Sequence, residues 1–508
     1  MADTFNFVTT LSVLELAQAL GLASPIERVT HSSGALVVLD SPALALRRHD
    51  RFLTLASEAG EPRLSLRRLK HPTTVVAAGP VRIPDAVRDI RDQPLRARLE
   101  KRMGDGRLVV VQHWQTHGLR HAYRNDDGKV ECMLVAQQYI AFAPNGPSSP
   151  VFVELRAQRG YEHETASVAR DLAQQLRLSI QDGDVLELLE ELQVAAATSQ
   201  CTDAPPLHRT AAATVLASWL LNHHTMMNAL VTRGVALEAD QLHALRVAMR
   251  HSRSLLRAYR DVLGRDVERH FQHEFRWLST ATSRLRDIDV LLAGVRAPAV
   301  DYATLTNRER ERLLSFLERE RARDARRLQG VLDASRYRRL RQTWPLVLAM
   351  AINQVPLVTP PIAALAAAAI GRALAQLRRD IIAVDAHYTP SAAHKLRKQC
   401  KRVRYLVAPC ESLYPREQVA WAQSGLKQLQ SVLGESCDRY AQLALFEGHL
   451  WRRAKGHPAI RAALRSARLV LRQRLTVSEV SFVLGALHEF EAGGYPATLE
   501  SLLKMPDP

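Results

Sequence analysis

Short runs of alternating apolar and polar residues mark the first third of the chain. They lie at residues 35–39, 75–81, 108–114, 130–141 and 151–156, separated by segments rich in Gly, Pro, Asn and Asp. Alternation with a period of two indicates strands that bury one face, and the turn residues between them indicate hairpins and loops. Helical spacing occurs at residues 12–20, at about 164–176 and at about 184–192. We therefore predict an antiparallel, β-rich N-terminal domain with a few helices.

A helical pattern replaces this alternation beyond residue 206 and continues, with few turn signals, to Gly493. Breaks near Gly264, Pro415 and residues 297–302, 355–361, 388–390 and 456–458 leave helices of roughly 15–30 residues, which is typical of helical bundles. Residues 195–206 are small and polar with a Pro pair, as in many linkers. The predicted organisation is a β-rich domain over residues 1–195, a linker over 196–206 and an all-α domain over 207–508. The fold class is α+β multidomain.

Charge divides the chain at the same place. The 508 residues carry 69 Lys and Arg against 52 Asp and Glu, a net charge of +17. Residues 1–200 hold 23 basic and 24 acidic residues, and residues 201–508 hold the other 46 and 28. The whole excess belongs to the helical region. A region this basic is expected to bind an acidic partner such as nucleic acid, an anionic membrane or a phosphate polymer.

Cysteine usage and hydropathy bear on the compartment. The five cysteines form no CxxC pair, which favours a reducing compartment and argues against a zinc ribbon or a disulfide framework. Residues 1–10 lack a signal-peptide pattern, and the longest apolar run, residues 360–370, is far shorter than the ~20 residues that span a bilayer. We expect a cytoplasmic protein without a membrane partner.

Two basic stripes carry the functional argument. The first runs through His243, Arg246, Arg250, Arg253 and Arg257 at steps of three and four, which places all five side chains on one face of a helix about 21 Å long. The second starts 151 residues later with the same spacing, at His394, Arg397, Lys401 and Arg404. This duplication predicts two related helices, each of which donates one stripe to a shared groove.

A solvated helix face is the ordinary explanation for one row of cations. Against it, no Asp or Glu occurs from Leu242 to Arg260, whereas exposed faces normally mix both signs. Like charges four residues apart also destabilise the bare helix, and the arrangement occurs twice. Facing stripes would bind a linear polyanion by charge-assisted hydrogen bonds and counterion release, and guanidinium groups suit phosphate oxygens.

Four motifs in the helical region resemble the CHAD family (conserved histidine α-helical domain). They are residues 243–257, residues 275–278 with 285–290, residues 394–405 and residues 429–434. The resemblance covers about residues 206–474. It implies two pseudo-symmetric antiparallel four-helix bundles whose basic helices line a central channel for inorganic polyphosphate, with Asp287 and Asp289 as structural partners of arginines. One family Arg is His251 here. The implied ligands are His243, Arg246, Arg250, Arg253, Arg286, His394, Arg397, Lys401 and Arg404, and Arg257, Lys398, Arg402 and Lys427 extend the stripes.

The N-terminal domain resembles the CYTH family, the triphosphate tunnel fold, in residues 39–48, 94–101 and 153–156. That resemblance implies an antiparallel β tunnel in which Glu residues bind a metal and basic residues bind triphosphate. The family's initial Glu-x-Glu-x-Lys is absent from residues 1–10, and its late Glu-x-Glu retains only Glu154, with Phe152 at the other position. Since one carboxylate is too few for a catalytic metal, we predict a tunnel-like domain without catalysis. The domain either keeps weak anion binding through Arg47, Arg67, Arg98 and Arg156 or serves only as a scaffold.

The leading functional prediction is a protein that binds inorganic polyphosphate, a long-chain phosphate anion, and is targeted to polyphosphate granules. We expect no catalytic residue, no metal ligand and no cofactor. One alternative is an inorganic triphosphatase or polyphosphate-processing enzyme, which the missing Glu-x-Glu-x-Lys disfavours. The other is a nucleic-acid-binding protein. It is disfavoured because only Tyr259 and Tyr405 lie beside the stripes, whereas single strands are usually bound by stacking their bases on aromatic rings.

Overall fold

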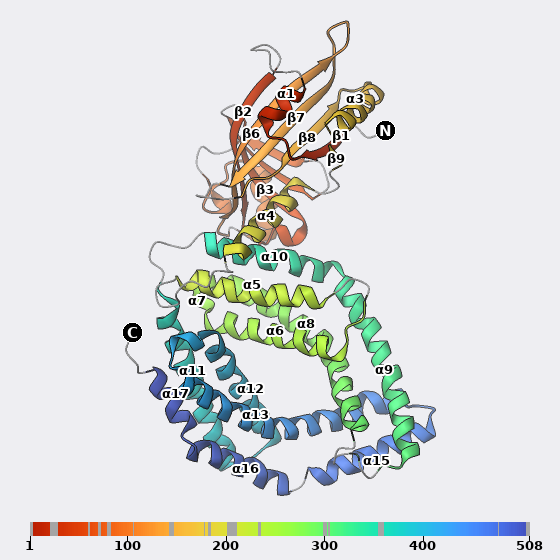
Figure 1. The fold of residues 1–508 in the computed structure, drawn as a ribbon, viewed down its shortest axis with the longest axis vertical. Coiled ribbons are helices and arrows are strands. Elements are labelled where there is room, and N and C mark those ends of the chain that lie inside the picture. Colours follow the sequence, from red (N-terminus) through yellow and green to blue (C-terminus); the bar gives the residue numbers. More distant parts are fainter. Residues whose placement is uncertain are drawn as a thin grey trace. The chain divides into compact units, whose positions relative to one another are not determined.

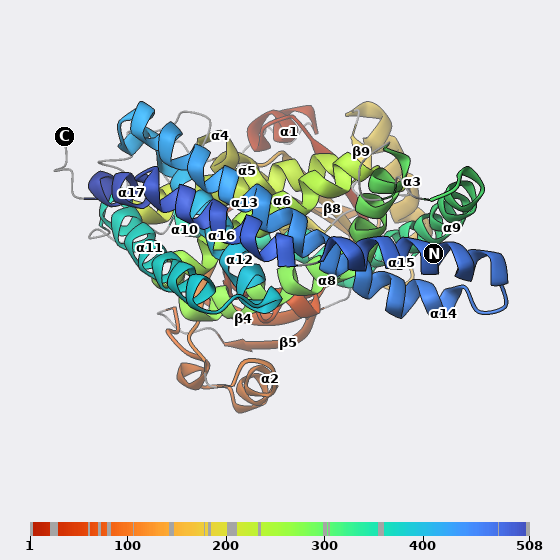
Figure 2. The ribbon, with the colours of Figure 1, turned by 90° about the horizontal axis from the view of Figure 1, so that it is seen from below.

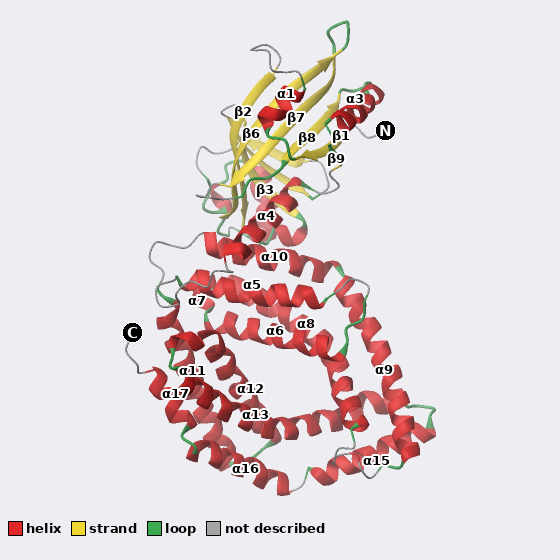
Figure 3. Ribbon diagram, in the orientation of Figure 1, coloured by secondary structure: helices red, strands yellow, loops and turns green. Residues whose placement is uncertain are grey.

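The computed structural model describes most of the chain. The described residues are 4–20, 29–58, 61–69, 73–78, 83–104, 106–141, 147–176, 178–180, 184–200, 211–231, 235–297, 302, 305–353, 360–475 and 477–503. They fall into two compact units, Met1–Asp203 with Pro345–Asn353, and Ala204–Trp344 with Gln354–Pro508. All nine described strands belong to the first unit, whereas the second is helical (Figure 3).

A single antiparallel sheet forms the centre of the first unit. In spatial order its strands are β5-β4-β3-β2-β6-β7-β8-β1-β9 (Figure 1). Two meanders, β2 to β5 and β6 to β8, therefore meet where β2 pairs with β6, and the described parts of β5 and β9 form the two edges. The strands are β1 (Thr4–Thr9), β2 (Val29–Asp40), β3 (Arg51–Glu58), β4 (Glu61–Arg68), β5 (Thr73–Ala78), β6 (Val109–Arg124), β7 (Val130–Ala141), β8 (Val151–Ala157) and β9 (Ser179–Ile180).

Helices cover this sheet through two separate apolar clusters. In the first, Leu16 of α1 (Val13–Ala19) and Leu172 of α3 (Glu162–Gln175) pack with Leu134 and other residues of β1, β6, β7 and β8. In the second, Leu95 and Leu99 of α2 (Gln93–Met103) pack against residues of β2, β3 and β4. These elements confirm the α+β class and the antiparallel, β-rich N-terminal domain.

One sequence-based element boundary needs correction in this unit. The described part of β5 is Thr73–Ala78, and residues 79–81 of the predicted strand lie outside the described residues. The short helix predicted near 184–192 is α4 (Val185–Gln200), so residues 196–200 of the predicted linker are helical. Residues 201–206 of that linker lie outside the described residues.

Helices follow one another through the rest of the chain. They are α5 (Ala212–Leu230), α6 (Ala239–Ala258), α7 (Arg260–Leu263), α8 (Arg265–Arg296), α9 (Asn307–Asp333), α10 (Ser335–Asn353), α11 (Ile362–Ala386), α12 (Pro390–Val407), the 3-10 helix η4 (Ala408–Leu413), α13 (Arg416–Leu445), the π-helix η5 (Phe446–Leu450), α14 (Trp451–Arg453), α15 (Pro458–Arg474), α16 (Val477–Ala492) and α17 (Tyr495–Leu503). No described helix is both long and apolar enough to cross a membrane.

The duplication predicted from the two stripes is visible in the way these helices pack. α5, α6, α8 and α9 contact one another in chain order, and α11, α12, α13 and α15 do the same. Between the two sets, α5 contacts α11, α6 contacts α12, α8 contacts α13 and α9 contacts α15. Each helix thus meets its own counterpart, as an isologous twofold interface requires. The helical region is two pseudo-symmetric four-helix bundles joined face to face.

Candidate polyanion-binding site

The two basic stripes lie on α6 and α12, and both helices are amphipathic for the same reason. Leu245 and Met249 of α6, and Leu396 and Val403 of α12, are buried and fix each helix in its bundle. α6 starts with a capping box at Glu238, and α12 starts with Thr389 as its N-cap and Pro390 in its first turn, two recognised helix-start signals. The basic side chains flank these apolar faces.

An aromatic contact joins the two stripe-bearing helices. The ring of His251 on α6 lies 3.9 Å, centroid to centroid, from the ring of Tyr405 on α12, and 5.3 Å from that of His223 on α5. Burial, with His223 and Arg250 nearby, lowers the pKa of His251 to about 4. The imidazole is therefore neutral near pH 7. Where the CHAD pattern has Arg, this chain has an uncharged packing residue between the bundles.

Lys401 marks the place where the stripes meet. Burial, together with the charges of Arg397 on its own helix and Arg250 on α6, lowers its pKa to about 8. Burial also lowers the pKa of His243, where Arg286 of α8, Arg250 and Lys401 add to the effect. Cations on α6, α8 and α12 therefore lie close enough together to lower one another's pKa values.

The α12 end of this group is equally basic. Burial lowers the pKa of His394, and Lys398, Arg397 and Lys401 reinforce the effect. The structure thus brings together eight predicted ligands, which we call the central cluster: His243, Arg246, Arg250, Arg286, His394, Arg397, Lys398 and Lys401.

A second group extends the cluster along the same two helices. Burial lowers the pKa of Arg253, with Arg276 and Arg257 adding to it, and that of Arg402, with Arg257 and Arg372 adding to it. Arg257 of α6 therefore lies close enough to Arg402 of α12 to lower its pKa. Arg276 and Arg372 were not predicted from the sequence.

Two predicted ligands remain to be placed. Arg404 donates from Nη1 to Oε1 of Gln430 on α13, at 2.8 Å. Lys427 is exposed on α13, and no interaction among the described residues joins it to either group. Lys427 is the predicted ligand least integrated with the others.

Several of these cations are held in place by neighbouring helices. Nη1 of Arg246 donates to Thr282 Oγ1 at 2.8 Å and to the Ser279 carbonyl at 3.0 Å, both on α8. Its counterpart Arg397 forms an ion pair with Asp438 of α13 at 3.3 Å and lies over Gly434, where a Cβ would be 3.0 Å from the guanidinium Nη2. These contacts orient the two side chains before any ligand arrives.

Other donors lack partners. The Nε atoms of Arg250, Arg397, Arg402 and Arg404 are buried and have no hydrogen-bond partner among the described residues. An unsatisfied buried donor costs about 1–3 kcal/mol, and the like charges repel one another as well. In the free protein these stripes are therefore electrostatically unfavourable.

Two carboxylates interrupt the positive field. Asp287 of α8 and Asp438 of α13 are separated by the same 151 positions as the stripes. Burial raises the pKa of Asp287, Asp438 raises it further, and Arg246 opposes both. Asp289 instead pairs with Arg321 of α9 at 2.7 Å, in keeping with the structural role predicted for it. The sequence analysis missed Asp438, although the repeat spacing points to it.

The arginines predicted for the N-terminal domain are largely occupied by the domain's own carboxylates. Arg47, only 3% exposed, binds Glu190 of α4 through Nε at 2.8 and 2.9 Å. Arg67 binds Asp184 at 2.6 Å, and Arg156 binds Glu154 at 2.7 Å. The last pair also engages the one carboxylate retained from the late Glu-x-Glu motif. Of the four, Arg98 is exposed on α2.

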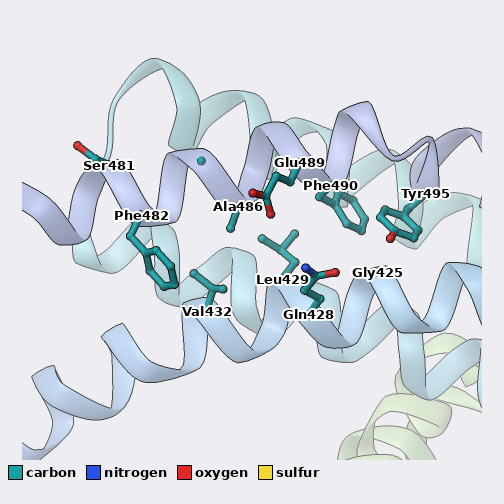
Figure 4. A pocket seen from close by; sticks show the side chains of 11 residues that line it. Gly425, Gln428, Leu429, Val432, Ser481, Phe482, Ala486, Glu489, Phe490 and Tyr495 are labelled. Carbon is teal, nitrogen blue, oxygen red and sulfur yellow. The ribbon is translucent and has the colours of Figure 1, made fainter. Parts of the chain in front are cut away.

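Two surface grooves lie away from the stripes. One runs between α13 and α16–α17, where Phe482, Phe490 and Tyr495 face Leu429 and Val432 (Figure 4). The other lies between α8 and α9 and contains the paired Arg284 and Asp324. The first is mainly apolar and the second is internally neutralised, so neither matches a polyanion.

Comparison with protein families identifies part of the helical region. Residues 220–447 match the family model described as the CHAD domain. This part of the chain is a CHAD domain. The match includes α6, α8, α12 and α13, the four helices that supply the predicted ligands. No curated protein matches the chain.

Several solved structures are similar to parts of the chain. The CHAD domain of the plant Ricinus communis has a TM-score of 0.45 and 21% identity, over 55% of this chain and 90% of that chain. PptA from Streptomyces chartreusis has a TM-score of 0.40 and 16% identity, over 56% and 100%. A Hippeastrum protein, described as an adenylyl cyclase with a dominant triphosphatase activity, has a TM-score of 0.28 and 13% identity, over 37% and 94%.

Proposed function

We propose that the CHAD domain binds inorganic polyphosphate along the facing stripes of α6 and α12, and that this binding recruits the protein to polyphosphate granules. The family match supports a polyphosphate-related function in general terms. The observation that carries the finer proposal is the position of Lys401, whose charge is opposed by Arg250 of the other bundle. A group of cations this close together needs a ligand with a high density of negative charge.

The chemistry of the groove favours phosphate oxygens over bases. Guanidinium groups bind phosphate oxygens through two parallel hydrogen bonds, and most of the cations on the two stripes are arginines. Tyr405, one of the two aromatic residues considered for base stacking, is covered by His251. The other, Tyr259, is buried. Neither ring is presented to a base, which disfavours nucleic acid.

The test compares two double variants of the full-length protein. Arg250→Ala/Lys401→Ala removes one charge from each stripe. Arg265→Ala/Arg269→Ala removes the same charge from exposed arginines of α8 that pair with Asp261 and Asp266. Titration with long-chain polyphosphate at fixed salt should show a loss of at least about tenfold in affinity and a shallower salt dependence in the first variant only.

Two results would refute the proposal. One is an equal effect of both variants, because binding would then follow net charge and not the groove. The other is displacement of polyphosphate by single-stranded DNA of equal charge at equal or lower concentration. That outcome would assign the groove to nucleic acid.

A further inference from the structure

A third basic stripe lies beyond the residues that match the CHAD model. Residues 451–474 contain eight Lys and Arg and no Asp or Glu. Along α15, Arg461, Arg465, Arg468 and Arg472 recur at steps of four, three and four. This spacing places them on one side of the helix, as on α6 and α12.

The opposite side of α15 is firmly packed. Leu464, Ala467 and Leu471 are buried in one apolar core with Phe316 of α9 and Phe446 of η5. The arginine side is therefore presented from a fixed helix and not from a loose surface segment. A fixed row of like charges suits a repetitive anionic ligand.

Three of these arginines surround a single aromatic ring. The guanidinium carbons of Arg461, Arg465 and Arg468 lie 4.9, 5.8 and 5.7 Å from the ring centroid of Trp451. The three charges are thus within about 12 Å of one another, comparable with the screening length in dilute salt. Attraction to the ring holds the side chains together although their charges repel.

Nearby carboxylates do not neutralise this group. Glu447 is paired with Arg472. Within the part of the chain that the structure describes, no carboxylate forms an ion pair with Arg461, Arg465 or Arg468, and Arg465 is exposed. The positive charge around Trp451 is therefore not neutralised by the protein.

A continuous helical path connects this surface with the central cluster. Asp438 of α13 pairs with Arg397, and Trp451 follows thirteen residues later along α13, η5 and α14. The intervening distance is about 20 Å at the rise of an α-helix. α15 lies beside η5 and α13, next to the end of this path (Figure 2). One extended polymer could contact both places.

We propose that Trp451, Arg461, Arg465 and Arg468 form a second phosphate-binding surface, which holds a distal part of the polyphosphate chain bound at α6 and α12. The inference rests on the proposed function and adds a selectivity for chain length. Long chains reach both surfaces and gain affinity because the second contact is intramolecular, whereas short chains occupy one. Guanidinium groups already surround the ring of Trp451, which favours phosphate over stacked bases.

The experiment measures binding of tripolyphosphate and long-chain polyphosphate to the full-length protein at fixed salt. The stripe variant is Arg461→Gln/Arg465→Gln/Arg468→Gln. Its affinity for the long chain should fall at least about tenfold, and its affinity for tripolyphosphate should be unchanged. The control variant Arg260→Gln/Arg265→Gln/Arg269→Gln removes equal charge and should retain the wild-type preference for long chains. If the stripe variant does not fold, the single substitution Arg465→Glu at an exposed position replaces it. This variant should also lose affinity for the long chain and keep its affinity for tripolyphosphate.

The outcomes separate the two proposals. If the long-chain affinity of the stripe variant equals that of the wild type, the second surface is refuted and the proposed function stands. If both ligands lose affinity equally, the second surface is also refuted, because a distal contact cannot affect the short ligand. A wild-type protein that binds neither ligand contradicts the proposed function itself. Single-stranded DNA that competes in the wild type but not in the stripe variant would assign this surface to nucleic acid.

Discussion

Lys401 offers the most direct test, because its charge depends on pH in the range where the neighbouring arginines stay protonated. With a pKa of about 8, about nine-tenths of Lys401 is charged at pH 7 and about one-tenth at pH 9. A bound polyanion favours the charged form and raises this pKa. If it restores the ordinary value of 10.5, proton linkage lowers the association constant about tenfold between pH 7 and pH 9, or about 1.4 kcal/mol.

The matched variant is Lys401→Arg, whose guanidinium keeps its charge over this range. Association constants for long-chain polyphosphate are measured for both proteins at pH 7, 8 and 9 with constant ionic strength. The ligand's own titration is common to both proteins, so the difference between their pH profiles isolates Lys401. Affinity should fall with pH in the wild type and much less in Lys401→Arg. Parallel pH profiles would refute the placement of Lys401 close to the α6 stripe.

Three further changes test other parts of the structure. Lys401→Met should raise the melting temperature of the free protein, because the depressed pKa of Lys401 means that folding disfavours the charged amine. The same change should weaken polyphosphate binding. A lower melting temperature would contradict the first expectation. Asp287→Asn removes an anion from the central cluster and should strengthen binding about fivefold, as expected for one charge at about 4 Å in water; unchanged titrations would place Asp287 away from the ligand. Glu190→Ala removes the main partner of the buried Arg47 and should lower the free energy of unfolding in urea by about 3–5 kcal/mol. Polyphosphate affinity should not change. A loss of stability below about 1 kcal/mol would refute the pairing.

Local sequence signals predicted the helical region well. α12 begins at Pro390, α13 begins directly after Pro415 and α8 begins directly after Gly264, because proline and glycine act on the backbone next to them. The period of the basic residues also predicted that α6 and α12 are counterparts. Such signals depend only on the chain within a few residues.

Contacts between distant segments were beyond sequence reasoning. The acids of α4 that bind Arg47 are about 140 positions away from it, and no local pattern links them. β3 and β4 were missed, although residues 63–67 of β4 alternate between polar and apolar side chains and Leu53 and Leu66 are fully buried. The neutral state of His251 depends on Tyr405 and His223, which come from two other helices.

The counterpart-to-counterpart packing of α6 and α12 has a consequence for the direction of a bound polymer. A ligand that crosses a twofold axis meets equivalent groups whichever end enters first. Inorganic polyphosphate reads the same from both ends, whereas a nucleic-acid strand has distinct 5′ and 3′ directions. A site with this internal symmetry would therefore hold a polyphosphate chain in the same way after the chain is turned end for end, whereas a nucleic-acid strand would have two distinct bound directions.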